Sequence, residues 1–276
     1  MKSLKPRLLT AAIGIPAIVL LIFLSELWHP LLNITVGIVS AVMVGEYLYG
    51  NRLLKVWPLS VVCIAFTLTF TLLIVTPYVY LIIFAFLLAA FIVGIVLHET
   101  VDYGKLSYAI LGTLLISFGM SAVPYACYGS ISLTFYFLAL FLLPWMADAG
   151  GFFIGSAMGR HKLCPNISPK KTVEGAIGGI LFCMIAAVGM GLVFNFFVFD
   201  NVSINYFSLV LLGFLDAICS IVGDLSFSLI KRHLGIKDYG TIFPGHGGFL
   251  DRCDSIIFTA PLVVVIGQFM PFLSLG

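Results

Sequence analysis

Residues 78–97 read YVYLIIFAFLLAAFIVGIVL and contain no charged side chain. About 20 helical residues cross the roughly 30 Å hydrocarbon core of a bilayer, and a backbone in lipid must satisfy its polar groups within its own segment. The run therefore predicts a transmembrane helix. Similar apolar stretches recur along the chain, so we expect an all-α polytopic membrane protein with about nine such helices, at residues 8–27, 31–48, 58–76, 78–97, 106–128, 131–158, 173–199, 206–230 and 255–275.

The composition supports this fold class. Hydrophobic residues make up 61% of the 276 residues and charged residues only 9%, against roughly a quarter in an average soluble domain. The formal charge of +2 comes without a basic block or an acidic tail, which excludes nucleic-acid binding. The six cysteines are scattered without a CxxC pair, so neither a disulfide framework nor a zinc site is expected.

The basic residues indicate the orientation in the membrane. The first apolar stretch follows Lys2, Lys5 and Arg7 but lacks a small-x-small cleavage pattern, so we expect a retained helix rather than a signal peptide. With nine alternating spans, all 14 Lys and Arg fall on one side, which the positive-inside rule assigns to the cytoplasm. The N-terminus and the loops 159–172 and 231–254 are then cytoplasmic.

Ionisable residues are concentrated in the second half of the chain. The first five predicted helices contain few ionisable residues besides Glu26 and Glu46. Glu46 lies close to its helix end, where a carboxylate can reach interfacial water, so we interpret it as structural. We therefore expect residues 1–140 to form a scaffold that faces lipid or another subunit, and residues 141–276 to carry the chemistry.

Carboxylates at membrane depth are costly and mark functional sites by default, although they also join helices through buried hydrogen bonds. Asp148, Asp216 and Asp224 are the candidates. At 100° per residue, Ser228 and Lys231 share a helical stripe with Asp224. Asp216 lies about 80° from that stripe and could be a second metal ligand only if the helix bends.

The loop before the seventh apolar stretch combines hydroxyl groups with a lysine pair. Lys170 and Lys171 lie between Ser168 and Thr172, directly before a predicted helix start. Helix N-terminal amides and ammonium groups together suit phosphate. The alternative is a basic loop that only fixes membrane orientation.

The densest group of polar residues is 231–254, KRHLGIKDYGTIFPGHGGFLDRCD. Asp251 and Asp254 are spaced i, i+3, as oxygen ligands on one helical face, and Asp224 could complete a divalent-cation site with Asp251. The glycines, among them Gly247 and Gly248, would let backbone amides approach phosphate. The side chains that would neutralise phosphate charge are Lys231, Arg232, Lys237 and Arg252. For His246, a structural hydrogen bond and proton transfer both stay open.

This segment resembles the signature of the phosphatidate cytidylyltransferase (CDP-diacylglycerol synthase) family, which joins Ser-x-apolar-Lys-Arg to Lys-Asp and then to His-Gly-Gly-apolar-x-Asp-Arg-apolar-Asp at fixed spacing. The likeness extends to Ser168-Pro-Lys-Lys-Thr172. The chain departs from the family pattern at two single positions and in one four-residue stretch. Cys253 replaces an apolar residue or Thr, Phe227 replaces a frequent acidic residue, and residues 149–152 read AGGF instead of the more usual SGAY.

The resemblance implies transfer of a cytidylyl group from CTP to phosphatidate, giving CDP-diacylglycerol and pyrophosphate with Mg²⁺. It also implies a bacterial-type inner (plasma) membrane location with the active site facing the cytoplasm. Asp224 and Asp251 would hold the cation and Asp254 would close its shell, with Asp148 and Asp216 as further candidates. Lys231 and Arg252 would act with Asp224 and Asp251 in catalysis. Substrate binding would involve Ser168, Lys170, Lys171, Thr172, Ser228, Arg232, Lys237, His246, Gly247 and Gly248. A second cation and a homodimer are alternatives that the sequence leaves open.

Two other functions compete with this interpretation. An ion-coupled transporter would use the buried Asp residues as a cation or proton relay, but it leaves the polar segment 231–254 unexplained. A CTP-dependent polyprenol or phytol kinase is closer in architecture. A CDP-alcohol phosphotransferase would show Asp-Gly-x-x-Ala-Arg, which the sequence lacks.

Overall fold

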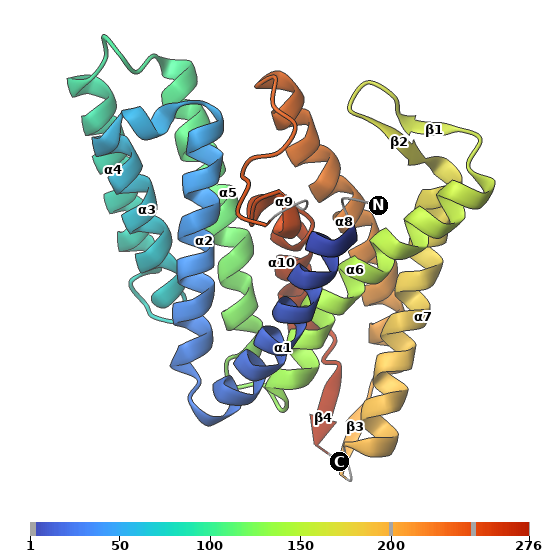
Figure 1. Cartoon of the computed structure of the whole chain (residues 1–276). Helices are drawn as coiled ribbons and strands as arrows, with labels where there is room; N and C mark the ends of the chain where they lie inside the picture. The colour runs from blue at the N-terminus through green and yellow to red at the C-terminus, as the bar shows by residue number, and fades with distance from the viewer. Residues whose placement is uncertain (1–3, 199–200, 244–246, 276) are drawn as a thin grey trace. The chain divides into compact units, whose positions relative to one another are not determined.

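The computed structural model describes residues 4–198, 201–243 and 247–275. Helices dominate these ranges, and each of the nine predicted apolar stretches contains one helix (Figure 1). The chain forms two compact units. One contains Met1–Tyr125 and Lys231–Cys253, and the other contains Ala126–Ile230 and Asp254–Gly276. The segment 231–253 therefore belongs to the same unit as the first helices of the chain.

The first unit is built on helices that follow one another along the chain. They are α1 (Leu4–Leu27), α2 (Pro30–Gly50), the 3₁₀ helix η1 (Leu53–Lys55), α3 (Trp57–Leu72), α4 (Val79–Val96) and most of α5 (Tyr103–Cys127), with the short α9 (Leu250–Cys253) added from the end of the chain. Helix α3 packs against both α2 and α4 (Figure 1). In the core, the rings of Tyr47 and Tyr108 stack with centroids 4.1 Å apart. Gly112 makes room for this stack, because a Cβ atom there would overlap the Tyr47 ring.

The second unit is organised around one close helix pair. Its elements are α6 (Leu133–Met158), β1 (Lys162–Cys164), β2 (Ser168–Thr172), α7 (Val173–Phe197), β3 (Val202–Ile204), most of α8 (Tyr206–His233), α10 (Ile256–Phe269) and β4 (Leu273–Leu275). Helices α6 and α7 meet through glycines. A Cβ atom at Gly179 would lie 2.7 Å from the Ala147 carbonyl oxygen, and one at Gly155 would lie 2.9 Å from Thr172 Oγ1. Such close backbone approach is typical of helix pairs in membranes.

The helices have the length and composition of membrane spans. Within the part of the chain that the structure describes, six helices are long and apolar enough to cross a bilayer: α2, α4, α5, α6, α7 and α8. Shorter apolar helical segments in the same part are residues 16–27 of α1, and helices α3 and α10. Apolar side chains on α4 point outward, with Leu81 62% and Ile95 70% exposed. Lipid is the environment in which such a surface is stable. The protein is therefore a helical membrane protein; nine spans and a cytoplasmic N-terminus stay predictions.

Three local predictions were wrong. The last predicted helix ends at Phe269 instead of continuing to residue 275, because Pro271 disfavours a helical conformation at Met270, and residues 273–275 pair with β3. The predicted loop 159–172 contains the antiparallel hairpin β1–β2, beside one end of α7, while β3–β4 lies beside the other end (Figure 1). Helix α9 ends at Cys253, so Asp254 lies in a turn and does not share a helical face with Asp251.

Candidate active site

The glycine-rich segment begins where helix α8 ends. Gly235 has a left-handed φ of 68°, its N–H donates to the Arg232 carbonyl, and the Ile236 N–H donates to the Lys231 carbonyl. These two bonds form a Schellman motif, which requires a residue at positive φ and therefore favours glycine. The motif ends the helix at His233 and turns the chain toward Tyr239 and the loop that follows.

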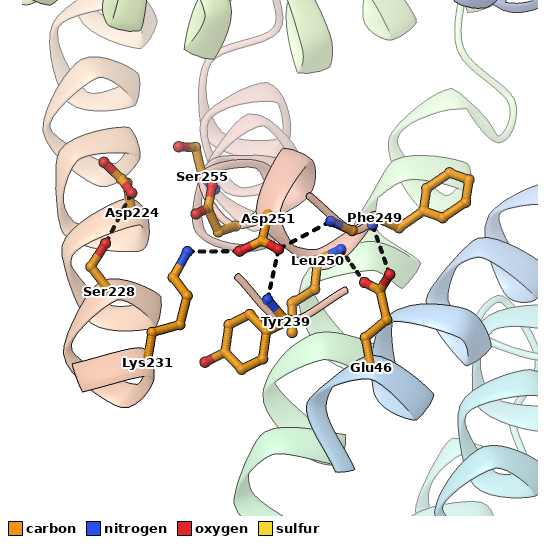
Figure 2. Close-up of polar contacts among 11 residues, drawn as sticks. Glu46, Asp224, Ser228, Lys231, Tyr239, Phe249, Leu250, Asp251 and Ser255 are labelled. Atoms are coloured by element: carbon orange, nitrogen blue, oxygen red, sulfur yellow. Dashed lines mark hydrogen bonds and ion pairs between the residues drawn. The ribbon is translucent and has the colours of Figure 1, made fainter. Parts of the chain in front are cut away.

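Asp251 is the best-connected carboxylate of the first unit. Its Oδ1 accepts a hydrogen bond from Lys231 Nζ at 2.8 Å, and its Oδ2 accepts from the backbone N–H groups of Tyr239 at 2.8 Å and Gly248 at 3.1 Å (Figure 2). The Asp251 side chain is only 2% exposed and that of Lys231 10%. Lys231 Nζ also lies 5.5 Å from the centre of the Tyr239 ring. The predicted Lys231 and Asp251 thus form a buried ion pair.

Close glycine packing shapes the loop around this carboxylate. Gly247 has a left-handed φ of 85°, and a Cβ atom there would approach Asp251 Oδ2 to 2.9 Å. Its carbonyl accepts from the Phe243 N–H at 2.9 Å, which closes the loop at its base. The positive φ and the close approach to Asp251 explain why residue 247 is a glycine. His246 and its neighbours at 244 and 245 lie outside the described residues.

Glu46 holds the same loop from helix α2. Its carboxylate accepts hydrogen bonds from the backbone N–H groups of Phe249 at 3.1 Å and Leu250 at 2.8 Å (Figure 2). Glu46 is 8% exposed. Glu46 was predicted to be an interfacial carboxylate, and its contact with the loop was not predicted. The one available signal was a carboxylate within an apolar helix, because the two partners lie more than 200 positions away along the chain.

The second unit contains another Lys–Asp pair. Lys171 Nζ on β2 lies 2.5 Å from Asp224 Oδ2 on α8, and the side chains are 23% and 28% exposed. Ser228, one helical turn after Asp224, donates to its Oδ1 at 3.3 Å (Figure 2). The predicted proximity of Asp224 and Ser228 is therefore confirmed. Lys171, which was predicted to bind phosphate, forms an ion pair with Asp224 in the structure.

A cavity of about 190 Å³ lies between α6, α7 and β2 in the same unit. Asp148, Lys170, Lys171 and Thr172 line it, together with glycines of both helices. Thr172 also caps α7, because its hydroxyl accepts from the Gly175 N–H at 3.1 Å. The structure thus brings an intramembrane carboxylate and the predicted lysine pair to one cavity wall.

Glu174 anchors the hairpin that carries the lysine pair. Its carboxylate accepts from the backbone N–H groups of Arg160 at 3.1 Å and His161 at 3.2 Å, and lies 2.6 Å from the His161 ring nitrogen Nδ1. The sequence analysis assigned Glu174 no contact. An acidic residue in the first turn of a helix was the available signal, since this position favours negative charge.

The other predicted site residues are distributed as follows. Helix α8 is continuous, so Asp216 and Asp224, eight residues apart, are separated by about 12 Å along its axis, too far for one ion to bind both. Asp216 is fully buried, and Cys183 Sγ lies 3.8 Å from its Oδ2. Asp254 accepts from the Ser255 N–H at 2.9 Å. Ser168 begins β2, and the remaining cations, Arg232, Lys237 and Arg252, are exposed.

The acidic side chains of the two units differ in what they offer a divalent cation from the dense cluster of a preformed metal site. Among residues 4–198, 201–243 and 247–275, no three His, Cys, Asp or Glu side chains lie together in a group that could hold a metal ion. Mg²⁺, however, usually takes only one or two protein carboxylates and completes its shell with water and substrate phosphates. Asp251 Oδ1 and Asp224 Oδ2 each pair with one lysine and keep further lone-pair capacity. Either carboxylate, taken by itself within its own unit, could therefore serve as one ligand of such an ion.

Comparisons with known proteins agree with the signature in the sequence. Curated proteins named phosphatidate cytidylyltransferase are similar to the chain: 45% identical in Staphylococcus haemolyticus, 42% in Staphylococcus epidermidis and 41% in Staphylococcus aureus, each over 131 residues. These alignments cover 48% of this chain and 48% of each relative, so the chain spans about half the length of the curated relatives it matches. Residues 5–270 match the cytidylyltransferase family. The chain therefore belongs to the cytidylyltransferase family.

Proposed function

We propose that the protein transfers a cytidylyl group from CTP to phosphatidate, forming CDP-diacylglycerol and pyrophosphate. The observation that carries this proposal is the buried carboxylate of Asp251, which Lys231 and two backbone N–H groups hold at the centre of the signature segment. Family membership and the names of the similar proteins support the same reaction.

In this reaction an ionised phosphate oxygen of phosphatidate attacks the α-phosphorus of CTP, a new P–O bond forms, and the bond to pyrophosphate breaks. The protein's contribution is to align two anions and to stabilise the charge that develops between them. The attacking phosphate is already ionised at neutral pH, so no dedicated general base is required.

The cations of each unit have distinct tasks in this proposal. Lys170 and Lys171 line the cavity between α6 and α7 and would pair with phosphate oxygens there. Lys231 and Arg252 would neutralise charge beside Asp251, with Arg232 and Lys237 on the exposed part of the segment. Ser168, Thr172, Ser228, Gly247 and Gly248 would add donors around the phosphates.

Mg²⁺ is the proposed cofactor. Asp224, Asp251 and Asp254 are the carboxylates that would hold it, and a bound Mg²⁺ would offset the negative charge of the substrate phosphates. The two lysines now paired with Asp224 and Asp251 would then be available to those phosphates. Whether a second cation takes part stays open.

The location proposed is the bacterial plasma membrane, crossed nine times with the N-terminus and the active site on the cytoplasmic side. Phosphatidate would then enter sideways with its acyl chains in the bilayer, and CTP would arrive from the cytoplasm. A homodimer is the assembly to test first.

The deciding experiment is turnover by the full chain, purified in detergent, with CTP, phosphatidate and Mg²⁺. We expect CDP-lipid and pyrophosphate in equal amounts, and a loss of about 100-fold or more per folded molecule for Asp251→Asn. Asp102→Asn is the matched control, because Asp102 is an exposed carboxylate whose Oδ1 caps the Lys105 N–H, and Asn retains that oxygen. Folded protein without turnover would contradict the proposal, and polyprenol kinase substrates would be tested next.

A further inference from the structure

We propose that Glu46 is a positioning residue of the active site: it fixes the backbone of residues 248–250 and thereby sets the orientation of Asp251. The inference rests on the proposed function, because it assigns Asp251 to the reacting centre. It adds a residue of helix α2, in the first part of the chain, to the machinery that the signature segment supplies.

The hydrogen bonds of three consecutive backbone N–H groups carry the argument. The Gly248 N–H donates to Asp251 Oδ2, and the next two, from Phe249 and Leu250, donate to the two oxygens of Glu46. Glu46 therefore binds the two residues that immediately precede Asp251 in the chain. Figure 2 shows the Glu46 carboxylate facing these amides from the end of α2.

The shape of the loop fits this carboxylate on two sides. A Cβ atom at Gly240 would overlap Glu46 Oε1, and a Cβ atom at Gly248 would overlap both of its carboxylate oxygens. Neither φ is in the left-handed region, so it is close packing that favours glycine here, against Glu46 at both positions and also against the Gly248 Cα, 3.1 Å away, at Gly240. The loop thus leaves the space of two side chains for Glu46.

A carboxylate is well suited to this task. It is an acceptor with about four lone-pair sites, so it can bind two adjacent amides without presenting a donor to either of them. Hydrogen bonds to an ionised acceptor are about twice as strong as neutral ones. An acid that served only to stabilise the helix end would not need two partners in the same turn as Asp251.

The first test compares Glu46→Gln and Glu46→Ala with the parent protein. Gln keeps one oxygen acceptor but presents an amide donor to the second N–H group, so we expect kcat to fall in the order parent, Gln, Ala, with a loss of about 10- to 100-fold for Ala. The KM for CTP should change less than kcat. Glu99→Gln, at an exposed acid of the same unit, is the control. Unchanged kcat per folded molecule in Glu46→Ala would overturn the proposal.

A double-mutant cycle tests the geometry more directly. Gly248→Ala should lose activity because its methyl group overlaps the Glu46 carboxylate, and Glu46→Ala makes room for that methyl group. The loss in Glu46→Ala/Gly248→Ala should therefore be smaller than the product of the single losses. Gly247→Ala is the matched control, since its strain comes from a positive φ and from Asp251, and its loss should multiply with that of Glu46→Ala. Equal coupling in both cycles would contradict the assignment.

A third measurement does not depend on turnover. Hydrogen–deuterium exchange of residues 247–253 should be faster in Glu46→Ala than in the parent, while exchange in α7 is unchanged. If the parent protein fails to make CDP-lipid, this result still reports on the loop, so failure of the proposed function and failure of the positioning role are distinguishable. Unaltered exchange in residues 247–253 would reject the role of Glu46.

Discussion

Glu46 and Asp251 divide between them the hydrogen bonds of three successive backbone N–H groups, those of Gly248, Phe249 and Leu250. One carboxylate comes from α2 and the other from the short helix α9 that follows the glycine-rich loop. Both carboxylates are almost fully buried, and the three N–H groups therefore bond to protein acceptors instead of water. The position of the signature loop therefore depends on a helix that contains none of the signature residues.

The buried pair of Lys231 and Asp251 should dominate the stability of the first unit. Removing one partner of a buried ion pair leaves an uncompensated charge and costs about 3–5 kcal/mol. We expect Lys231→Met and Asp251→Asn each to lower the free energy of unfolding by an amount of this order. The double variant should be more stable than the sum of the two losses predicts. Denaturation in detergent, followed by circular dichroism, measures all three, and strictly additive losses would show that the two side chains do not interact.

The pair of Lys171 and Asp224 should behave differently, because about a quarter of each side chain is exposed. Solvent weakens such pairs to about 0–1 kcal/mol. We therefore expect Asp224→Asn to change the free energy of unfolding far less than Asp251→Asn does, while its turnover of CTP is still strongly reduced. Both quantities should be measured on the same preparation. A destabilisation as large as that of Asp251→Asn would mean that Asp224 is a structural residue.

The helices were predictable from sequence because, in lipid, each segment must satisfy its own backbone hydrogen bonds. Each of the nine apolar stretches contains a helix, but two were placed too long: α3 ends at Leu72 instead of residue 76, and α10 ends at Phe269, where Pro271 breaks the pattern. The hairpin β1–β2 was not predictable in this way. Its strands are short and polar, and they are defined by pairing between Lys162 and Thr172 rather than by a pattern within either strand.

The candidate site also combines residues that a local sequence pattern predicts with contacts between distant parts of the chain that no such pattern predicts. The signature identified Asp251 and Lys231, but it assigned Lys231 to phosphate, and their direct contact across 20 positions was not predicted. The contact of Glu46 with Leu250 joins residues 204 positions apart, and no local pattern in α2 marks it. Sequence spacing therefore predicts the residues of the signature segment more readily than the residue that holds this segment from another helix.

The α6–α7 pair provides a prediction about folding. A methyl group at Gly179 would lie 2.7 Å from the Ala147 carbonyl oxygen, which is backbone and cannot rotate away, whereas a methyl group at Gly189 on the same helix meets nothing within 4 Å. We expect Gly179→Ala to destabilise the protein by about 1–3 kcal/mol, and Gly189→Ala to leave it unchanged or slightly more stable. Thermal unfolding of the two variants in one detergent compares them. Equal midpoints would show that α6 and α7 do not pack as described.

Glu174 should control the hairpin that carries Lys170 and Lys171. Its carboxylate accepts from the Arg160 and His161 amides and contacts the His161 ring, and the exposed chain around these residues offers trypsin cleavage sites at Arg160 and Lys162. Glu174→Ala removes the acceptor for both amides, so the base of the hairpin should open more often and be cleaved faster. Glu99→Ala is the control, at an exposed acid in the other unit. Limited proteolysis with mass spectrometry of the fragments gives the cleavage rate at each site.

If the proposed phosphate contacts of the lysine pair depend on this hairpin, the same Glu174→Ala variant should raise the KM for CTP or for phosphatidate. Faster cleavage with both KM values unchanged would show that opening of the hairpin does not affect substrate binding.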